Sequence, residues 1–368
     1  MKTLNERWDI VGHTWAIESL ENAIRAKRNA HAFLLSGPHS IGKTTLARAL
    51  AKRLLCSAND APVSQNSLFG ETTIVNEPPC GECRACIKVT KNVHPDITLL
   101  EGVPPRWDYD KKGAAPPRAS EREKRTLVVE QIRDAEKWLA TAPFESKYKV
   151  LILRRFEDAN ENAQNAFLKT LEEPPAHAVL ILTAQDAGLL LPTIVSRCQP
   201  LTLRPLAART VENALMEKWN VAPQDAQLLA HISDGRLGWA VRALNTPQLL
   251  ETRREALEAL NALVHEGRAE RITRAEALAK ESAELPQLFE MWQTWWRDVL
   301  LMSQQQSARI TNIDFNTQLA QQAEQFSSMD IHRALNATRT AARQLSQNAN
   351  ARLVTEVLVL DLPRAPAL

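Results

Sequence analysis

The most specific chemical signal in the sequence is the loop Gly37-Pro38-His39-Ser40-Ile41-Gly42-Lys43-Thr44. It matches the pattern G-x-x-x-x-G-K-[ST], follows a short apolar run and precedes a helical pattern, which is the context of a phosphate-binding loop. The glycines let backbone N–H groups face phosphate oxygens, while Lys43 reaches the outer phosphates and Thr44 a magnesium ion. The alternative is a glycine-rich turn with an incidental lysine, but such a turn need not follow a strand and precede a helix. The sequence therefore predicts nucleotide binding.

Hydrolysis requires acidic residues at the end of a second strand, where they hold the metal and orient the attacking water. The candidate strand, residues 149–153, is followed by Arg154 and Arg155 instead. Two cations repel Mg²⁺ and cannot act as a base. Glu157 and Asp158 come slightly later, but a register shift toward the site would leave their side chains beyond the strand end. We therefore expect ATP or ADP to bind without competent hydrolysis, and the sequence leaves a role for Mg²⁺ open.

A second candidate site is formed by cysteines. Cys80, Cys83 and Cys86 follow one another at two C-x-x-C spacings, and Cys56 ends the preceding helical pattern. Four thiolates fit tetrahedral Zn²⁺, and a shell without an open position supports structure rather than catalysis. The alternatives are an iron–sulfur cluster, a redox-active C-x-x-C pair and unligated thiols. His94 is a weaker candidate for the fourth ligand.

Both candidate sites need a sheet to position them. Short apolar runs bounded by turns or charges predict strands. These runs lie at residues 32–35, 97–100, 127–129, 150–153 and 179–183, and the first helical patterns are at 17–28 and 43–56. Because the strands alternate with helices, we expect a parallel sheet with helices on both faces, the doubly wound α/β class.

The rest of the chain differs in character. Residues 102–125 combine prolines, small residues and mixed charge, so we expect a mobile surface insertion. After residue 205, strand signals nearly vanish and helical periodicity continues, which predicts an all-helical final third. Within it, Phe289, Trp292 and Trp296 have the spacing of a packing stripe on a helix. We favour that interpretation over stacking of nucleic-acid bases on the tryptophans.

Composition limits the class of protein. A chain of 368 residues, 44% hydrophobic and 24% charged, is typical of two or three globular domains. It contains no apolar run of membrane-spanning length and no signal-peptide pattern, so we expect a soluble cytoplasmic protein. A net charge of +2 neither identifies nor excludes contact with nucleic-acid phosphates. Five cysteines, most of them clustered, do not fit a secreted disulfide scaffold. Cys198, which is distant from the other four in the sequence, is expected to be a small buried side chain.

Several segments together resemble the bacterial clamp-loader branch of the AAA+ ATPases, over nearly all of residues 5–245. Trp8-Asp9-Ile10-Val11-Gly12-His13 resembles the family's adenine-side segment. Residues 165–175, N-A-F-L-K-T-L-E-E-P-P, are similar to its N-A-L-L-K-T-L-E-E-P-P stretch, and Ser196-Arg197-Cys198 matches its S-R-C motif. In that family this arginine reaches the ATP of a neighbouring subunit and stabilises charge that develops during phosphoryl transfer. A surface cation or the partner of a carboxylate is the alternative for Arg197.

The resemblance implies a domain plan and a set of site residues. An AAA+ domain would span residues 1–205, with the zinc module at 56–86 and the insertion at 102–125. A small helical lid would span 206–245 and a helical collar for oligomerisation 246–368. The implied nucleotide-binding residues are Val11, Gly12, Gly37, Gly42, Lys43, Thr44 and Thr45; the implied metal ligands are Cys56, Cys80, Cys83 and Cys86; and Arg197 would act in trans.

The chain departs from the family's hydrolysing subunits at three places. These are the Arg154-Arg155 pair, a sensor residue that is either Thr183 or Gln185, and Gly238, near which those subunits carry an arginine. The resemblance therefore implies a DNA-replication subunit that donates an arginine instead of hydrolysing ATP on its own. It would belong to the DNA polymerase III holoenzyme, a DNA-directed DNA polymerase and nucleotidyltransferase.

The implied partners are gamma/tau-type and delta-type loader subunits in a hetero-pentamer, the sliding clamp, and primer–template DNA reached through the assembly, with no membrane. Two other functions remain open. One is a catalytically active gamma/tau-type ATPase, against which Arg154 and Arg155 argue. The other is a zinc-containing adaptor with a vestigial loop, which nucleotide binding abolished by Lys43→Ala would exclude.

Overall fold

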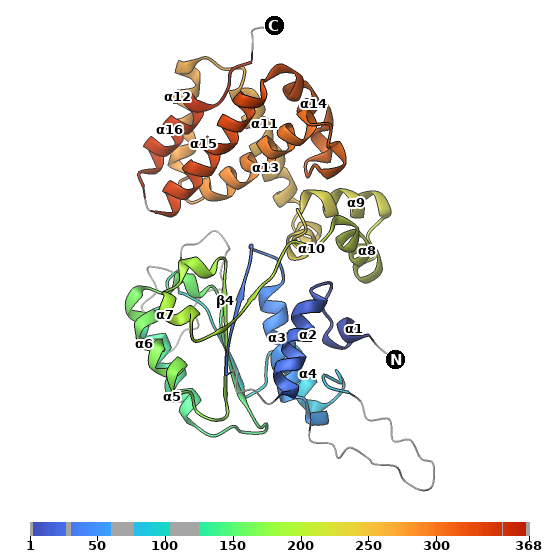
Figure 1. Cartoon of the computed structure of the whole chain (residues 1–368), viewed down its shortest axis with the longest axis vertical. Coiled ribbons are helices and arrows are strands. Elements are labelled where there is room, and N and C mark those ends of the chain that lie inside the picture. Colours follow the sequence, from blue (N-terminus) through green and yellow to red (C-terminus); the bar gives the residue numbers. More distant parts are fainter. Residues whose placement is uncertain (1–2, 27–30, 60–76, 104–124, 348, 366–368) are drawn as a thin grey trace. The chain divides into compact units, whose positions relative to one another are not determined.

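The computed structural model describes residues 3–26, 31–59, 77–103, 125–347 and 349–365. They form two compact units that divide between Leu206 and Ala207, and each unit is described by itself (Figure 1). The insertion predicted at residues 102–125 lies almost wholly outside the described residues. No described helix is both long and apolar enough to cross a membrane.

A five-stranded parallel sheet forms the centre of the first unit, in the order β2-β3-β4-β1-β5. The strands are β1 (Ala32–Ser36), β2 (Ile97–Leu100), β3 (Lys149–Leu153), β4 (Ala178–Ala184) and β5 (Gln199–Thr202). Every residue of β1, β3 and β4 is buried. Strands covered on both faces have continuous apolar sequences, which is why these three could be predicted.

Helices cover both faces of this sheet (Figure 1). On one face Leu35 packs with α2 (Thr14–Arg25) and α3 (Lys43–Leu55); on the other its neighbour Leu34 packs with α5 (Val129–Ala140) and α6 (Glu161–Glu172). The remaining helices are α1 (Leu4–Trp8), α4 (Arg84–Thr90) and α7 (Pro192–Val195), with 3-10 turns η1 (Ser57–Asn59), η2 (Phe156–Asp158) and η3 (Ala187–Leu189). The predicted α/β class is confirmed.

Two details of the sheet differ from the prediction. Residues 127–129 are not a strand, because Leu127 makes only an isolated bridge to Ala159 and Val129 begins α5. An apolar run of three residues has no periodicity that distinguishes a strand from the buried start of a helix. The strand β5 was not predicted, since it contains Gln199 and Pro200 and buries only part of its surface.

In the described part of the second unit every element is helical, as predicted. The α-helices are α8 (Ala208–Trp219), α9 (Pro223–Ile232), α10 (Leu237–Asn245), α11 (Gln248–Leu263), α12 (Arg268–Lys280), α13 (Leu285–Ser303), α14 (Asn316–Gln325), α15 (Ser328–Ser346) and α16 (Ala351–Asp361), and the 3-10 turns are η4 (Ser307–Arg309) and η5 (Ile313–Phe315). The division of this unit into a lid and a collar at residue 245 stays a prediction.

The core of the second unit centres on α13. Phe289, Trp292, Trp295 and Trp296 are fully buried in it. The indole N–H of Trp292 donates to the backbone oxygen of Ala256 at 3.0 Å, and that of Trp295 donates to a side-chain oxygen at 2.8 Å. The packing-stripe interpretation is therefore confirmed, since rings buried in this way present no face for a nucleic-acid base.

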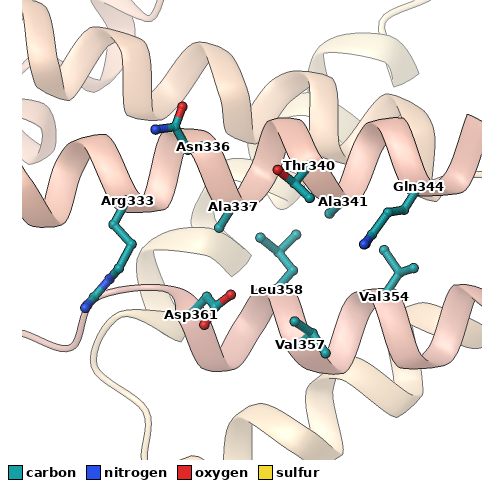
Figure 2. Close-up of a pocket in the computed structure, with 10 residues that line it drawn as sticks. All are labelled: Arg333, Asn336, Ala337, Thr340, Ala341, Gln344, Val354, Val357, Leu358 and Asp361. Atoms are coloured by element: carbon teal, nitrogen blue, oxygen red, sulfur yellow. The ribbon is translucent and has the colours of Figure 1, made fainter.

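A groove of about 340 Å³ lies between α15 and α16 (Figure 2). Arg333 and Asp361 lie at one end of it and Gln344 and Val354 at the other, while Leu358 points into its middle. None of the predicted site residues lines this groove. The candidate nucleotide and metal sites lie in the first unit instead.

Candidate nucleotide and metal sites

The phosphate loop connects the end of β1 to the start of α3, as the sequence predicts. Gly37 and Gly42 have φ angles of +140° and +108°, in the region that favours glycine. A Cβ atom on Gly37 would also meet the backbone oxygen of Leu203 at 2.5 Å. The N–H of Gly37 donates to the backbone oxygens of Ala184 and Gln185, at 3.2 Å each. These contacts fix the start of the loop against the end of β4.

Lys43 folds back over this loop. Its ammonium donates to the backbone oxygens of Gly37 and Pro38 at 2.5 and 2.7 Å. Burial lowers the pKa of Lys43 to about 8; the charge of Glu157 opposes this change and the charge of Arg155 adds to it. The lysine is thus a desolvated cation at a helix N-terminus, which is suited to binding a phosphate.

The adenine-side segment lies next to the loop. The side-chain amide of Asn5 donates to the backbone oxygens of Ile10 and Gly12 at 3.1 and 2.7 Å, which shapes the turn through Val11. The Nε2 atom of His13 lies 3.2 Å from the backbone oxygen of Ile41, and burial lowers the pKa of this histidine.

The nucleotide-binding residues predicted from the sequence are thus brought together in one region. Thr44 is half-buried and Thr45 exposed in the first turn of α3.

Both arginines after β3 are paired with carboxylates. Arg154 donates to Glu101 at 2.8 Å, and the Arg155 guanidinium lies 2.9 Å from the carboxylate of Asp158. Arg155 has φ +51° and its N–H donates to the hydroxyl of Thr183 at 3.0 Å. The two residues directly after β3 are therefore cations, each matched by a carboxylate.

Sequence reasoning missed Glu157. We expected its side chain to lie beyond the strand end, but the 3-10 turn η2 reverses the chain after Arg155 and no register shift is needed. Its Oε1 accepts a hydrogen bond from the N–H of Gln185 at 3.1 Å, beside the start of the phosphate loop. A three-residue turn without glycine or proline leaves no sequence signal for this reversal.

Arg197 follows α7 and precedes β5. Its guanidinium lies 2.6 Å from the carboxylate of Glu172, the last residue of α6, and donates to the backbone oxygen of Thr193 at 2.8 Å. The carboxylate partner that the sequence left as an alternative is therefore present. The side chain is one-third exposed, and its contact with Glu172 lies near the surface, where such ion pairs contribute little to stability.

The strand register separates Arg197 from the loop of its own chain. Gln199 pairs with Phe33 near the start of β1, whereas the phosphate loop follows Ser36 at the end of that strand. The N–H of Leu203 donates to the backbone oxygen of Ser36. The four residue steps from Gln199 to Leu203 span about 13 Å. Arg197 precedes this stretch, toward the edge where the strands begin.

The four cysteines form the cluster predicted from their spacing. The Sγ atoms of Cys56 and Cys80 are 3.6 Å apart, those of Cys56 and Cys83 3.9 Å, and those of Cys80 and Cys86 4.0 Å. All four lie within 4.8 Å of one another. Tetrahedral Zn²⁺ with bonds of about 2.3 Å places its sulfur ligands about 3.8 Å apart. The side chains therefore fit a tetrahedral metal ion.

Backbone N–H groups also favour negative sulfur at this cluster. Those of Cys80, Cys83 and Cys86 point at the sulfurs of Cys56, Cys80 and Cys83, with N–S distances of 3.5, 3.4 and 3.4 Å. A hydrogen bond from Cys86 lowers the pKa of Cys56 to about 5 and raises the pKa of Cys86, and burial raises the pKa of Cys80. Thiolate character is what a zinc ligand needs.

His94 and Cys198 lie outside the cluster. His94 is buried, its Nδ1 accepts a hydrogen bond from the N–H of Asp96 at 3.1 Å, and its Nε2 lies 3.3 Å from the hydroxyl of Ser146. Cys198 is buried, as predicted, and burial raises its pKa to about 12. The four-cysteine set therefore needs no histidine ligand.

Comparison with known proteins identifies the family. A family model described as DNA polymerase III, delta subunit, matches residues 12–207, and one for the C terminal part of that subunit matches residues 247–363. The chain is 26% identical to the delta' subunit of Bacillus subtilis over 347 residues, 93% of this chain and 94% of that protein. It is 32% identical to the delta' subunit of Pseudomonas aeruginosa over 276 residues, 74% of this chain and 72% of that one.

A further relative is the tau subunit of Bacillus subtilis, 28% identical over 242 residues; the match covers 64% of this chain but only 37% of the tau subunit. The chain thus spans little more than a third of that tau subunit, whereas it spans nearly all of the delta' subunit from the same organism. The chain therefore belongs to the DNA polymerase III clamp-loader family, as a subunit of the delta-prime type.

Proposed function

We propose that this clamp-loader subunit binds a nucleotide without hydrolysing it and donates Arg197 to the ATP site of a neighbouring subunit. The observation that carries the proposal is the separation of the two groups on one sheet. The phosphate loop follows the end of β1, and Arg197 lies toward the edge where β1 begins. An arginine there serves the phosphate of another chain rather than its own.

The nucleotide part of the proposal rests on the loop itself. The positive-φ glycines, the helix N-terminus and the buried ammonium of Lys43 together offer hydrogen-bond donors and positive charge to phosphate oxygens. Hydrolysis has no support, because Arg154 and Arg155 stand where a metal ligand and a base are needed.

For the arginine to act, its contact with Glu172 must break. Both side chains are partly exposed, so this ion pair costs about 1 kcal/mol or less to open. A developing triphosphate charge at a subunit boundary is a stronger partner for a guanidinium than one surface carboxylate. Glu172 thus holds Arg197 only weakly and does not withhold it from a neighbour.

The partners we propose are gamma/tau-type and delta-type subunits in a hetero-pentamer held by helices of residues 246–368, with the sliding clamp and primer–template DNA reached through the assembly. DNA contact would be shared and mainly to phosphates. Cys56, Cys80, Cys83 and Cys86 would hold a Zn²⁺ ion that braces the segment between α3 and β2. We place the protein in the cytoplasm.

The test is DNA-stimulated ATP turnover by the reconstituted loader. Arg197→Ala is compared with the native chain and with Arg133→Ala, which removes an exposed arginine of α5. We expect the first substitution to slow turnover by about tenfold or more, and the second to leave it unchanged. Glu172→Gln should not slow turnover, since it only releases the arginine.

The native chain is also assayed alone, and assembly of each variant is confirmed by size-exclusion chromatography. Turnover by the isolated chain would show that it is an ATPase in its own right. Unchanged turnover with Arg197→Ala in a fully assembled loader would refute the donated arginine.

A further inference from the structure

Glu157 is a half-buried acid that the proposed function does not use. One of its oxygens, Oε1, accepts the N–H of Gln185 at 3.1 Å. The other, Oε2, is buried and has no hydrogen-bond partner within the described part of the chain. Burial raises the pKa of Glu157 and the charge of Arg155 lowers it, so the ionised carboxylate depends on nearby cations.

The backbone contacts connect this carboxylate to the phosphate loop and, through it, to Lys43. Gln185, whose N–H holds Glu157, accepts a hydrogen bond from the N–H of Gly37 at 3.2 Å, and the backbone oxygen of Gly37 accepts the ammonium of Lys43 at 2.5 Å. The carboxylate is therefore held beside the first residue of the loop on which Lys43 rests. In agreement, Glu157 is the charge that most opposes the lowering of the Lys43 pKa by burial.

The neighbouring acid does not share this position. Asp158 lies 2.9 Å from the guanidinium of Arg155 and accepts a hydrogen bond from it at 3.2 Å, so its charge is matched locally. Arg155 thus pairs directly with Asp158 and acts on Glu157 only through its charge, and Glu157 is the acid held beside the loop.

We propose that Glu157 is an internal competitor of phosphate: its carboxylate acts as the counter-charge of Lys43, and a nucleotide binds only against its repulsion. The inference rests on the proposed nucleotide binding by the loop. Like charges repel one another over about 10 Å where a site is partly desolvated and poorly screened. A single carboxylate near the loop can thus weaken the binding of any phosphate there, whatever base or sugar it carries.

The experiment compares the native chain with Glu157→Gln and Glu161→Gln. The second variant removes the same charge from an exposed residue in the first turn of α6 and serves as the matched control. Binding of ADP and of inorganic pyrophosphate is measured by titration calorimetry. EDTA is present, so that no carboxylate can act through a metal ion. Thermal unfolding verifies that both variants fold.

We expect Glu157→Gln to bind both ligands about tenfold more tightly or better, and Glu161→Gln to match the native chain. If the native chain binds and Glu157→Gln binds equally or more weakly, the competition is refuted while nucleotide binding stands. If none of the chains binds, the nucleotide function fails and the competition fails with it. Binding by Glu157→Gln alone supports the competition and shows that the native loop is blocked.

A second measurement needs no nucleotide. The rate at which acetic anhydride modifies Lys43 at neutral pH, determined by mass spectrometry, depends on the fraction of free amine. Removing the negative charge lowers the pKa of the lysine further, so Glu157→Gln should raise this rate about threefold. A rate equal to that of Glu161→Gln would refute the charge interaction between Glu157 and Lys43, whatever the binding result.

Discussion

Replacing Asp96 by asparagine tests how the cysteine segment is tied to the sheet. Asp96 precedes β2 and is completely buried. Its Oδ1 accepts the N–H of Phe144 at 2.6 Å, and its Oδ2 accepts those of Glu145 and Ser146 at 2.9 and 3.0 Å. The loop before β3 is therefore held by one carboxylate. Lys88 of α4 in turn pairs with Glu145 at 2.6 Å, which connects the loop to the cysteine segment.

The cost of Asp96→Asn follows from these contacts. The amide keeps one oxygen, so at best two of the three N–H groups retain an acceptor, and the amide NH₂ points at the third. Loss of one hydrogen bond to a charged group costs about 1.5–3 kcal/mol, and the stranded donor costs about 1–3 kcal/mol more. We expect the loop to lose about 3 kcal/mol or more of local stability, which is more than a hundredfold in the opening equilibrium.

Hydrogen–deuterium exchange of the backbone amides at residues 144–146 measures this directly, because it reports local opening even when the units do not unfold together. The control is Asp134→Asn, which changes an exposed acid of α5. We expect these amides to exchange about a hundredfold faster in Asp96→Asn and at the native rate in the control. Exchange accelerated by less than about threefold would refute the carboxylate as the anchor of the loop.

Two further predictions concern the candidate sites. Cys83→Ser should lose the zinc that elemental analysis finds in the native chain and lower its melting temperature, whereas Cys198→Ala, outside the cluster, should keep the metal; zinc-free native protein would contradict the metal assignment. Phosphate affinity should fall by up to about tenfold per pH unit as the pH rises through about 8, the pKa of Lys43. The reason is that a free amine must be protonated again when phosphate binds. If calorimetric titration with pyrophosphate shows no pH dependence between neutral and alkaline solution, this role of the lysine is refuted.

Local sequence was sufficient to predict part of this molecule. The phosphate loop and the cysteines Cys80, Cys83 and Cys86 are each encoded within a few consecutive residues, and the chain geometry brings those residues together almost unaided. The buried strands β1, β3 and β4 are continuous apolar runs, so burial on both faces shows directly in the residue types.

The features that sequence did not predict depend on contacts across the fold. The ion pair of Arg197 with Glu172 joins residues of two different elements, and neither residue type is specific for such a pair. The edge strand β5 is held by its pairing with β1 rather than by a strand-like sequence of its own. The position of Glu157 depends on the turn η2 and on the backbone N–H of Gln185, the residue that follows β4.

Parallel pairing would let one sheet take part in the two nucleotide sites that we propose. All five strands point the same way, so every segment that follows a strand lies at one edge and every segment that precedes one lies at the other. The phosphate loop follows β1 and Arg197 precedes β5, and the two strands are neighbours. Arg154 and Arg155 follow β3 and therefore lie at the same edge as the chain's own loop, away from Arg197. Under the proposed function, a subunit of this topology would lack hydrolysis at its own site and still keep an arginine for the site of a neighbour.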